Sequence, residues 1–174
     1  LELLSNFYPL NSKQIFNYRN SLDNELLLNN TAIEWNSDIL SQFTRIEDWE
    51  ILSTNPSVFI DSKNIDEFYD NIHWQDPNQS LFSTIANNYG ISWTTELIEK
   101  YKSSWDYYQL SYNPYVPWSE KLIDEHLDEW DWGALSGNPK LPWSLDFFSK
   151  YSSRIVTDNF FFSINPSLTG NFDI

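Results

Sequence analysis

Apolar residues recur along this 174-residue chain in a pattern that repeats every 25 positions in its second half. When the stretches that open at Trp93, Trp118 and Trp143 are aligned, apolar side chains follow 4, 5, 8 and 12 positions after the tryptophan. This spacing places them on one face of an α-helix, and polar or charged residues fill most positions between them. The pattern predicts a helix of about twelve residues in each repeat, too short to be stable alone in water and therefore held by its neighbours.

The same pattern extends more loosely over the whole chain. It divides the sequence into six units, which begin at Leu10, Trp35, Ile60, Trp93, Trp118 and Trp143. A partial unit at residues 1–9 precedes them, and an insertion at residues 75–82, rich in Pro, Asn and Ser, lengthens the third unit. Self-similarity at a fixed period is typical of stacked repeats that pack mainly on their neighbours. We therefore predict a single array over residues 1–174, an all-α solenoid of about six helix–turn–short-helix repeats.

Two columns of residues are suited to begin helices. The position after each opening residue holds a side chain whose oxygen can cap the first helix. These residues are Asn11, Asn36, Asp61, Thr94, Ser119 and Ser144. A second column is predicted to cap the shorter helix, and it comprises Asp23, Asp48, His73, Asp106 and Asp131.

One asparagine recurs in all six units, and four of the six precede a proline. The column comprises Asn30, Asn55, Asn88, Asn113, Asn138 and Asn165. Asn tolerates left-handed backbone geometry and bonds nearby backbone groups, and Pro forbids continuation of a helix, so the column predicts the exit of the second helix. Catalysis needs one asymmetric constellation, whereas an array needs the same turn in every unit. We therefore interpret these asparagines as structural.

The segment from Trp93 to Trp143 follows the motif W-[ST]-x-x-L-I-x-x-[YH]-x-x-x-W-D-[WY]-x-x-L-S-x-N-P-x-[VL]-P-W. In this motif the chain resembles the tandem Trp and Asn-Pro repeats of uncharacterised bacterial and viral proteins. The resemblance covers nearly the whole chain, strictly in the fourth and fifth units, with Leu10 and Ile60 departing from the opening Trp and residues 155–157 departing from W-D-[WY]. It implies a helical repeat fold and carries over no activity, cofactor or catalytic residue.

Composition narrows the chemistry. The absence of Cys excludes disulfides, thiolate metal ligands and a Cys nucleophile. With 25 acidic and 10 basic residues and a net charge of −15, the chain lacks the basic footprint of a protein that binds nucleic-acid phosphates. No apolar run approaches the ~20 residues of a membrane span, and no P-loop, nucleophile elbow or dinucleotide motif is present. We predict no enzymatic activity, no cofactor, no membrane association and a cytoplasmic location.

The two histidines fit repeat columns better than a metal site. His126 stands in an aromatic column with Tyr18, Phe43, Phe68, Tyr101 and Tyr151, so we expect it to pack in the core. His73 stands in the second capping column. We therefore predict no metal site.

The chain contains no Met, and it opens like the tail of a truncated repeat. We expect it to be a fragment of a longer protein. An active site in another part of such a protein stays an open alternative.

Three tyrosines break their columns in the fourth unit. Tyr108, Tyr112 and Tyr115 stand where other units carry mostly polar or small residues. Tyr is enriched at interaction hot spots because its ring gives contact area and its hydroxyl gives a hydrogen bond, so these residues are candidates for binding. The alternative is that they pack under the 75–82 insertion.

Carboxylates on the next predicted helix complete the candidate contact region. Asp124, Asp128 and Glu129 lie on what should be its outer face, where like charges one turn apart repel slightly. They are suited to bind a basic partner, or they form a solvated face.

These features favour a non-catalytic scaffold or binding module whose acidic, tyrosine-bearing surface meets a protein partner of basic character. One alternative is an acidic inhibitor or decoy that neutralises a toxin or mimics nucleic acid. Another is carbohydrate binding through exposed aromatic rings, which requires that the tyrosines be exposed.

Overall fold

The structure is a computed structural model, and it describes residues 1–76, 83–158, 160–163 and 165–168. Every regular element in these ranges is a helix, and none is a strand. The predicted all-α class is therefore confirmed. Most of the predicted insertion at residues 75–82 lies outside the described residues.

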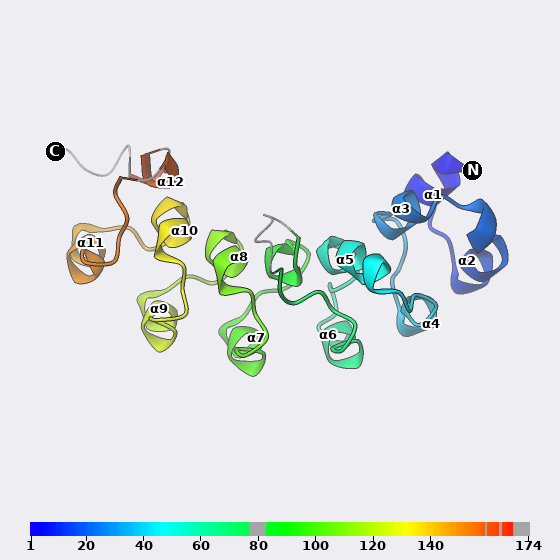
Figure 1. Cartoon of the computed structure of the whole chain (residues 1–174), viewed down its shortest axis with the longest axis horizontal. Helices are drawn as coiled ribbons and strands as arrows, with labels where there is room; N and C mark the ends of the chain where they lie inside the picture. Colours follow the sequence, from blue (N-terminus) through cyan, green and yellow to red (C-terminus); the bar gives the residue numbers. More distant parts are fainter. Residues whose placement is uncertain (77–82, 159, 164, 169–174) are drawn as a thin grey trace. The chain divides into compact units, whose positions relative to one another are not determined.

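The chain divides into two units, Leu1–Ser92 and Trp93–Ile174, at the point where the predicted fourth repeat begins. In the first unit, α1, α3 and α5 pack in sequence, and α2 packs on α4 (Figure 1). The helices of the first unit are α1 (Glu2–Phe7), α2 (Ser12–Tyr18), η1 (Arg19–Ser21), α3 (Asn24–Leu28), α4 (Ser37–Leu40), α5 (Ile46–Thr54), α6 (Lys63–Glu67) and η2 (Ile85–Asn87).

The second unit alternates between two rows of helices (Figure 1). One row holds α7, α9 and α11, and the other holds α8, α10 and α12, in which α10 packs on both α8 and α12. The bounds are α7 (Thr95–Lys100), α8 (Tyr107–Tyr112), α9 (Glu120–Glu125), α10 (Trp132–Gly137), α11 (Leu145–Tyr151) and α12 (Phe160–Ser163).

The predicted caps of the first helices are found at five of six positions. In α9, for example, the Ser119 side chain accepts a hydrogen bond from the backbone N–H of Leu122. Asn11 forms a reciprocal capping box with Gln14. The exception is Asp61: α6 begins one residue later than predicted, although the Asp61 carboxylate still accepts from the Lys63 N–H at 2.9 Å. Because capping is a local interaction, the sequence is sufficient to locate it.

These first helices are about half as long as predicted. α9 ends at Glu125, and His126 leaves helical geometry with φ −128° and ψ 34°. The indole N–H of Trp130 then donates to the Ile123 carbonyl at 3.3 Å, and the Trp105 indole does the same for Ile98 in α7 at 3.0 Å. The buried indole supplies a donor for a carbonyl at the end of the helix, so the chain can turn early.

The second capping column is only partly as predicted. Asp23, Asp106 and Asp131 cap α3, α8 and α10. Asp48 does not act as a cap, because α5 begins two residues before it. The buried Asp48 carboxylate instead pairs with the Arg19 guanidinium at 3.4 Å.

His73 does not cap the short helix of its repeat, because Thr84 caps η2 instead. The His73 backbone N–H donates to the Ser53 hydroxyl at 2.8 Å.

Within the first unit, the aromatic column is buried where another predicted repeat precedes it. Rings in this column contact the preceding repeat: the Arg19 guanidinium lies 4.4 Å from the Phe43 ring, and Trp49 lies 5.3 Å from Phe68. Tyr18, in the first predicted repeat, is 56% exposed, whereas Phe43 and Phe68 are buried. In these two cases, a side chain of one predicted repeat covers an aromatic ring of the next.

Candidate functional site

Five of the six recurring asparagines join one predicted repeat to the residues of the previous one. The Nδ2 of Asn138 donates to the carbonyls of Ser111 (2.9 Å) and Asn113 (3.3 Å), and its Oδ1 accepts from the backbone N–H of Lys140 (3.0 Å). The same pattern recurs at Asn55. Three further asparagines of the column also donate to two backbone carbonyls of the preceding repeat, namely Asn30, Asn88 and Asn165.

The asparagine backbone is extended rather than left-handed. Asn138, for example, has φ −76° and ψ 117°. The expected αL geometry is therefore wrong for this position, and the side-chain amide makes the turn instead. All six asparagines are buried, so their amides lie away from solvent.

Tryptophan and serine side chains complete this network. The Asn113 carbonyl accepts from the indole N–H of Trp118 at 2.9 Å as well as from Asn138. The Ser111 hydroxyl donates to the Tyr107 carbonyl at 2.6 Å and accepts from the Asp131 backbone N–H at 3.1 Å. These buried polar groups are paired with each other, so they offer no free chemistry to a ligand.

The three candidate tyrosines lie on α8 and on the connector after it. Tyr108 and Tyr112 are half-buried, and their rings meet edge to face with centroids 5.3 Å apart. Burial, and secondarily a hydrogen bond with Tyr108, raises the pKa of the Tyr112 hydroxyl, so this group stays protonated. Tyr115 is 59% exposed. The cluster thus offers one exposed ring beside two partly covered ones.

The candidate carboxylates lie on α9 and the turn after it, and two of them are engaged by the next repeat. Asp124 accepts from the Lys150 ammonium at 2.8 Å and from the Tyr151 hydroxyl at 2.9 Å. The hydrogen bond from Lys150 is the main reason that the pKa of Asp124 lies below its ordinary value. The Arg154 guanidinium donates to Asp128 at 2.7 Å.

Glu129 is the remaining candidate carboxylate, and it is exposed. The structure therefore places the candidate residues in two groups, one on α8 and its connector and one on α9 and its turn. Asp124 joins α9 to α11, and Asp128 joins the turns that follow these two helices.

His126 is buried, as its column predicts, but it is not surrounded by apolar groups alone. Its Nδ1 lies 3.2 Å from the Tyr107 hydroxyl, and its Nε2 lies 3.5 Å from the Glu99 carboxylate. Burial raises the pKa of Tyr107 to about 12, so the phenol remains protonated near neutral pH. This row of carboxylate, imidazole and phenol could not be found from the repeat pattern, because its members belong to three different columns. It links the fourth predicted repeat to the fifth.

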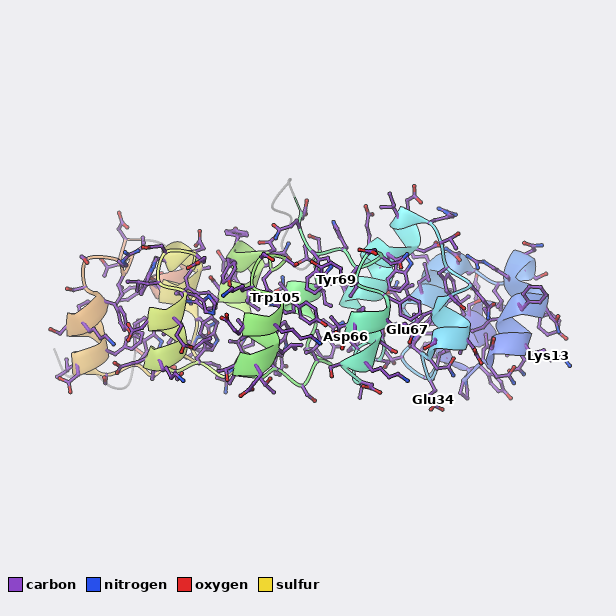
Figure 2. All side chains as sticks on the ribbon, turned by 90° about the horizontal axis from the view of Figure 1, so that it is seen from below. Lys13, Glu34, Asp66, Glu67, Tyr69 and Trp105 are labelled. Carbon is purple, nitrogen blue, oxygen red and sulfur yellow. The ribbon has the colours of Figure 1, made fainter. Side chains whose placement is uncertain are left out.

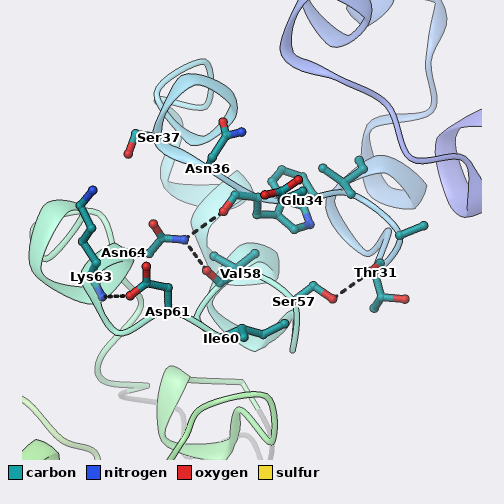
Figure 3. A pocket seen from close by; sticks show the side chains of 13 residues that line it. Thr31, Glu34, Asn36, Ser37, Ser57, Val58, Ile60, Asp61, Lys63 and Asn64 are labelled. Atoms are coloured by element: carbon teal, nitrogen blue, oxygen red, sulfur yellow. Dashed lines mark hydrogen bonds between the residues drawn. The ribbon is translucent and has the colours of Figure 1, made fainter.

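A groove in the first unit is a candidate site that sequence reasoning missed. It has a volume of about 430 Å³ and lies between two connectors, residues 31–37 and 57–64 (Figure 3). Buried Trp35 and Val58 contribute to its lining, and exposed Glu34 and Asp61 bring one carboxylate from each connector. The available signal was that Ile60, which also lines the groove, replaces the Trp that opens four of the six predicted units.

No three His, Asp or Glu side chains in the described ranges converge in a way that could hold a metal ion. Within the same ranges, no helix combines the length and the apolar character that crossing a bilayer requires.

Comparisons with protein-family models, with curated proteins and with solved structures found no match to this chain.

Proposed function

We propose that this chain is a non-catalytic scaffold, an all-α solenoid of about six stacked repeats, that presents an acidic, tyrosine-bearing surface to a protein partner of basic character. The observation that carries the proposal is the group of Tyr108, Tyr112 and Tyr115. Tyr115 is exposed at a connector where other repeats have small or polar residues, and the edge-to-face pair of Tyr108 and Tyr112 lies just before it.

The use of polar side chains elsewhere supports a scaffold rather than an enzyme. The asparagine and serine columns are hydrogen-bonded to backbone groups of neighbouring repeats, and Asp124 and Asp128 are ion-paired with α11 and the turn that follows it. Such pairing stabilises contacts between predicted repeats. It leaves exposed Tyr115 and exposed Glu129 to meet a partner. The exposed side chain of a tyrosine can contribute contact area and a hydrogen bond at low entropic cost.

The test is affinity capture from a cell extract of the source organism, with the chain immobilised beside a Tyr108/Tyr112/Tyr115→Ala variant. We expect a basic protein that the wild type retains and the triple variant loses. Tyr89→Ala is the matched control, because Tyr89 is also a connector tyrosine and is also 59% exposed. Equal retention by the wild type and the triple variant would contradict the tyrosine surface.

Elution with increasing salt separates this proposal from the decoy alternative. A decoy whose carboxylates occupy a basic groove should lose its partner steeply as ionic strength rises, whereas a partner anchored by tyrosine rings should be lost gradually. The decoy is favoured if the partner is lost between low and physiological salt and if the triple variant captures that partner as well as the wild type does.

A further inference from the structure

Two repeat columns change character at the groove between residues 31–37 and 57–64. The opening position of the third predicted repeat holds Ile60, which is 64% exposed, whereas the opening tryptophans Trp35 and Trp93 are buried. Four positions later, where the fourth and fifth repeats have Leu97 and Leu122, this repeat has Asn64. Both changed residues line the same groove. At this groove, the exposed Ile60 and the polar Asn64 therefore stand where most repeats have a tryptophan and an apolar residue.

Asn64 brings an acceptor without a donor to this groove. The residue is only 8% exposed, and its Nδ2 donates to the carbonyls of Trp35 (3.0 Å) and Val58 (2.6 Å). Its Oδ1 has no hydrogen-bond partner among the residues that the structure describes. Figure 3 shows this oxygen turned away from the two bonds that fix the amide. The residue is buried, but this oxygen is accessible to solvent, so a donor-bearing group in the groove can bond to it in place of water.

Two carboxylates also line the groove, one from each connector. The Glu34 carboxylate makes no hydrogen bond or ion pair with the described residues. Asp61 accepts one bond, from the Lys63 backbone N–H. Lys63 is the single cation of the lining, so the groove carries one net negative charge from Glu34, Asp61 and Lys63. The first unit, Leu1–Ser92, reinforces this sign, since it contains 13 acidic and 4 basic residues and has a net charge of −9.

We propose that this groove binds the guanidinium group of an arginine side chain from a partner polypeptide. A guanidinium has five N–H donors and no acceptor. The groove offers it acceptors, namely the Asn64 amide oxygen and the Glu34 and Asp61 carboxylates. The methylene stem of the arginine lies along exposed Ile60, where its apolar surface is covered. This site lies in the first unit and does not rest on the tyrosine surface proposed above.

The experiment uses a capped peptide, acetyl-Gly-Arg-Gly-amide, titrated into the ¹⁵N-labelled chain and followed by NMR. We expect shifts of the Asn64 side-chain amide and of the Glu34 and Asp61 backbone signals, with a Kd on the order of millimolar. The same peptide with citrulline in place of arginine keeps similar shape and loses the charge, so it should bind at least about tenfold more weakly. Equal binding of the two peptides, or no shift at these three residues at about 20 mM arginine peptide, would overturn the proposal.

Four variants assign the interaction to the groove. Glu34→Gln and Asp61→Asn remove one charge each and keep an oxygen acceptor, so each should weaken binding several-fold. Lys63→Gln removes the competing cation and should strengthen it. Ile60→Trp restores the residue that opens most repeats, narrows the groove and should abolish the shifts. Glu50→Gln, at an exposed position outside the groove, is the matched control and should bind like the wild type.

Two results keep the site distinct from the tyrosine surface. The Tyr108/Tyr112/Tyr115→Ala variant should bind the arginine peptide normally, and Glu34→Gln should still retain the basic partner if that partner is held by the tyrosines. If Glu34→Gln, Asp61→Asn and Lys63→Gln all bind the arginine peptide like the wild type, the groove is not its site, whatever the outcome for the tyrosines.

Discussion

At the scale of single residues, the recurring asparagine is explained by its side chain. One amide provides an acceptor for its own turn and two N–H donors for carbonyls of the preceding repeat, as Asn138 does. Asp has no donor, and Ser has one hydroxyl on a shorter stem, so neither can replace these three bonds. The column was found from the sequence, but its bonds were not, because their partners are 25 to 27 residues away.

Asn138→Ala should therefore lower the free energy of unfolding by about 1–3 kcal/mol, because the buried Ser111 and Asn113 carbonyls each lose a donor. Urea unfolding followed by tryptophan fluorescence measures the change. Asn17→Ala is the control: Asn17 is exposed within α2, where Ala is the better helix former, so no loss is expected. If Asn138→Ala and Asn17→Ala unfold at similar urea concentrations, the Asn138 amide does not stabilise the folded chain as proposed.

Asp124 gives a prediction that depends on pH. The Lys150 hydrogen bond holds the pKa of Asp124 in the folded chain below the ordinary value of 3.8. The pair therefore stabilises the folded chain at pH values above 3.8, and this contribution is lost as the pH falls through the lowered pKa. Wild type should be more stable than Asp124→Asn in urea at pH 7, and the difference should shrink as the pH is lowered below 3.8.

The matched control for this comparison is Asp70→Asn, because Asp70 is also an exposed aspartate. It should change stability little at pH 7. A difference between the wild type and Asp124→Asn that persists unchanged at low pH would show that the carboxylate charge is not its cause.

At the scale of elements, the sequence located helix starts better than helix ends. A start depends on a cap such as Ser119 and on the next three residues, so the pattern is sufficient. The early end of α9 depends on the Trp130 indole, seven residues from the carbonyl that it bonds. A periodic apolar pattern continues through such a turn, because Trp130 is buried whether or not the helix continues. The predicted length of the helix was therefore too great, although Trp130 is buried as predicted.

The Ser119 cap can be tested directly. Ser119→Ala removes the oxygen that accepts the Leu122 N–H at 3.2 Å and should lower the free energy of unfolding by about 1 kcal/mol. Ser103→Ala, at an exposed turn position, should change it by less than about 0.5 kcal/mol. Ser119→Asp should recover the loss, because Asp can cap the same amide and favours the positive end of the helix dipole. Failure of Asp to recover stability would argue against a capping role.

At the scale of the whole molecule, the candidate sites differ in how far sequence could find them. The tyrosines were visible because each departs from its column, yet the half-burial of Tyr108 and Tyr112 depends on the packing of α8. Asp124 and Asp128 were recognised as surface acids, but their cations, Lys150 and Arg154, are 26 residues later in the chain. To find the groove, one had to know that two residues that depart from their columns, Ile60 and Asn64, are neighbours in the fold. Sequence therefore identified unusual residues, and only the fold showed which of them share a surface.

The net charge of −15 leads to a prediction for the chain as a whole. Surface ion pairs such as Arg154 with Asp128 each contribute little to stability. The 15 negative charges in excess repel one another and destabilise the folded chain. Raising NaCl from about 10 mM to about 150 mM shortens the range of this repulsion, so the thermal unfolding midpoint at pH 7 should rise. At the isoelectric pH of about 4.2 the net repulsion is absent, and the same salt step should give no rise. A midpoint that falls with salt at pH 7 would mean that ion pairs outweigh the net charge.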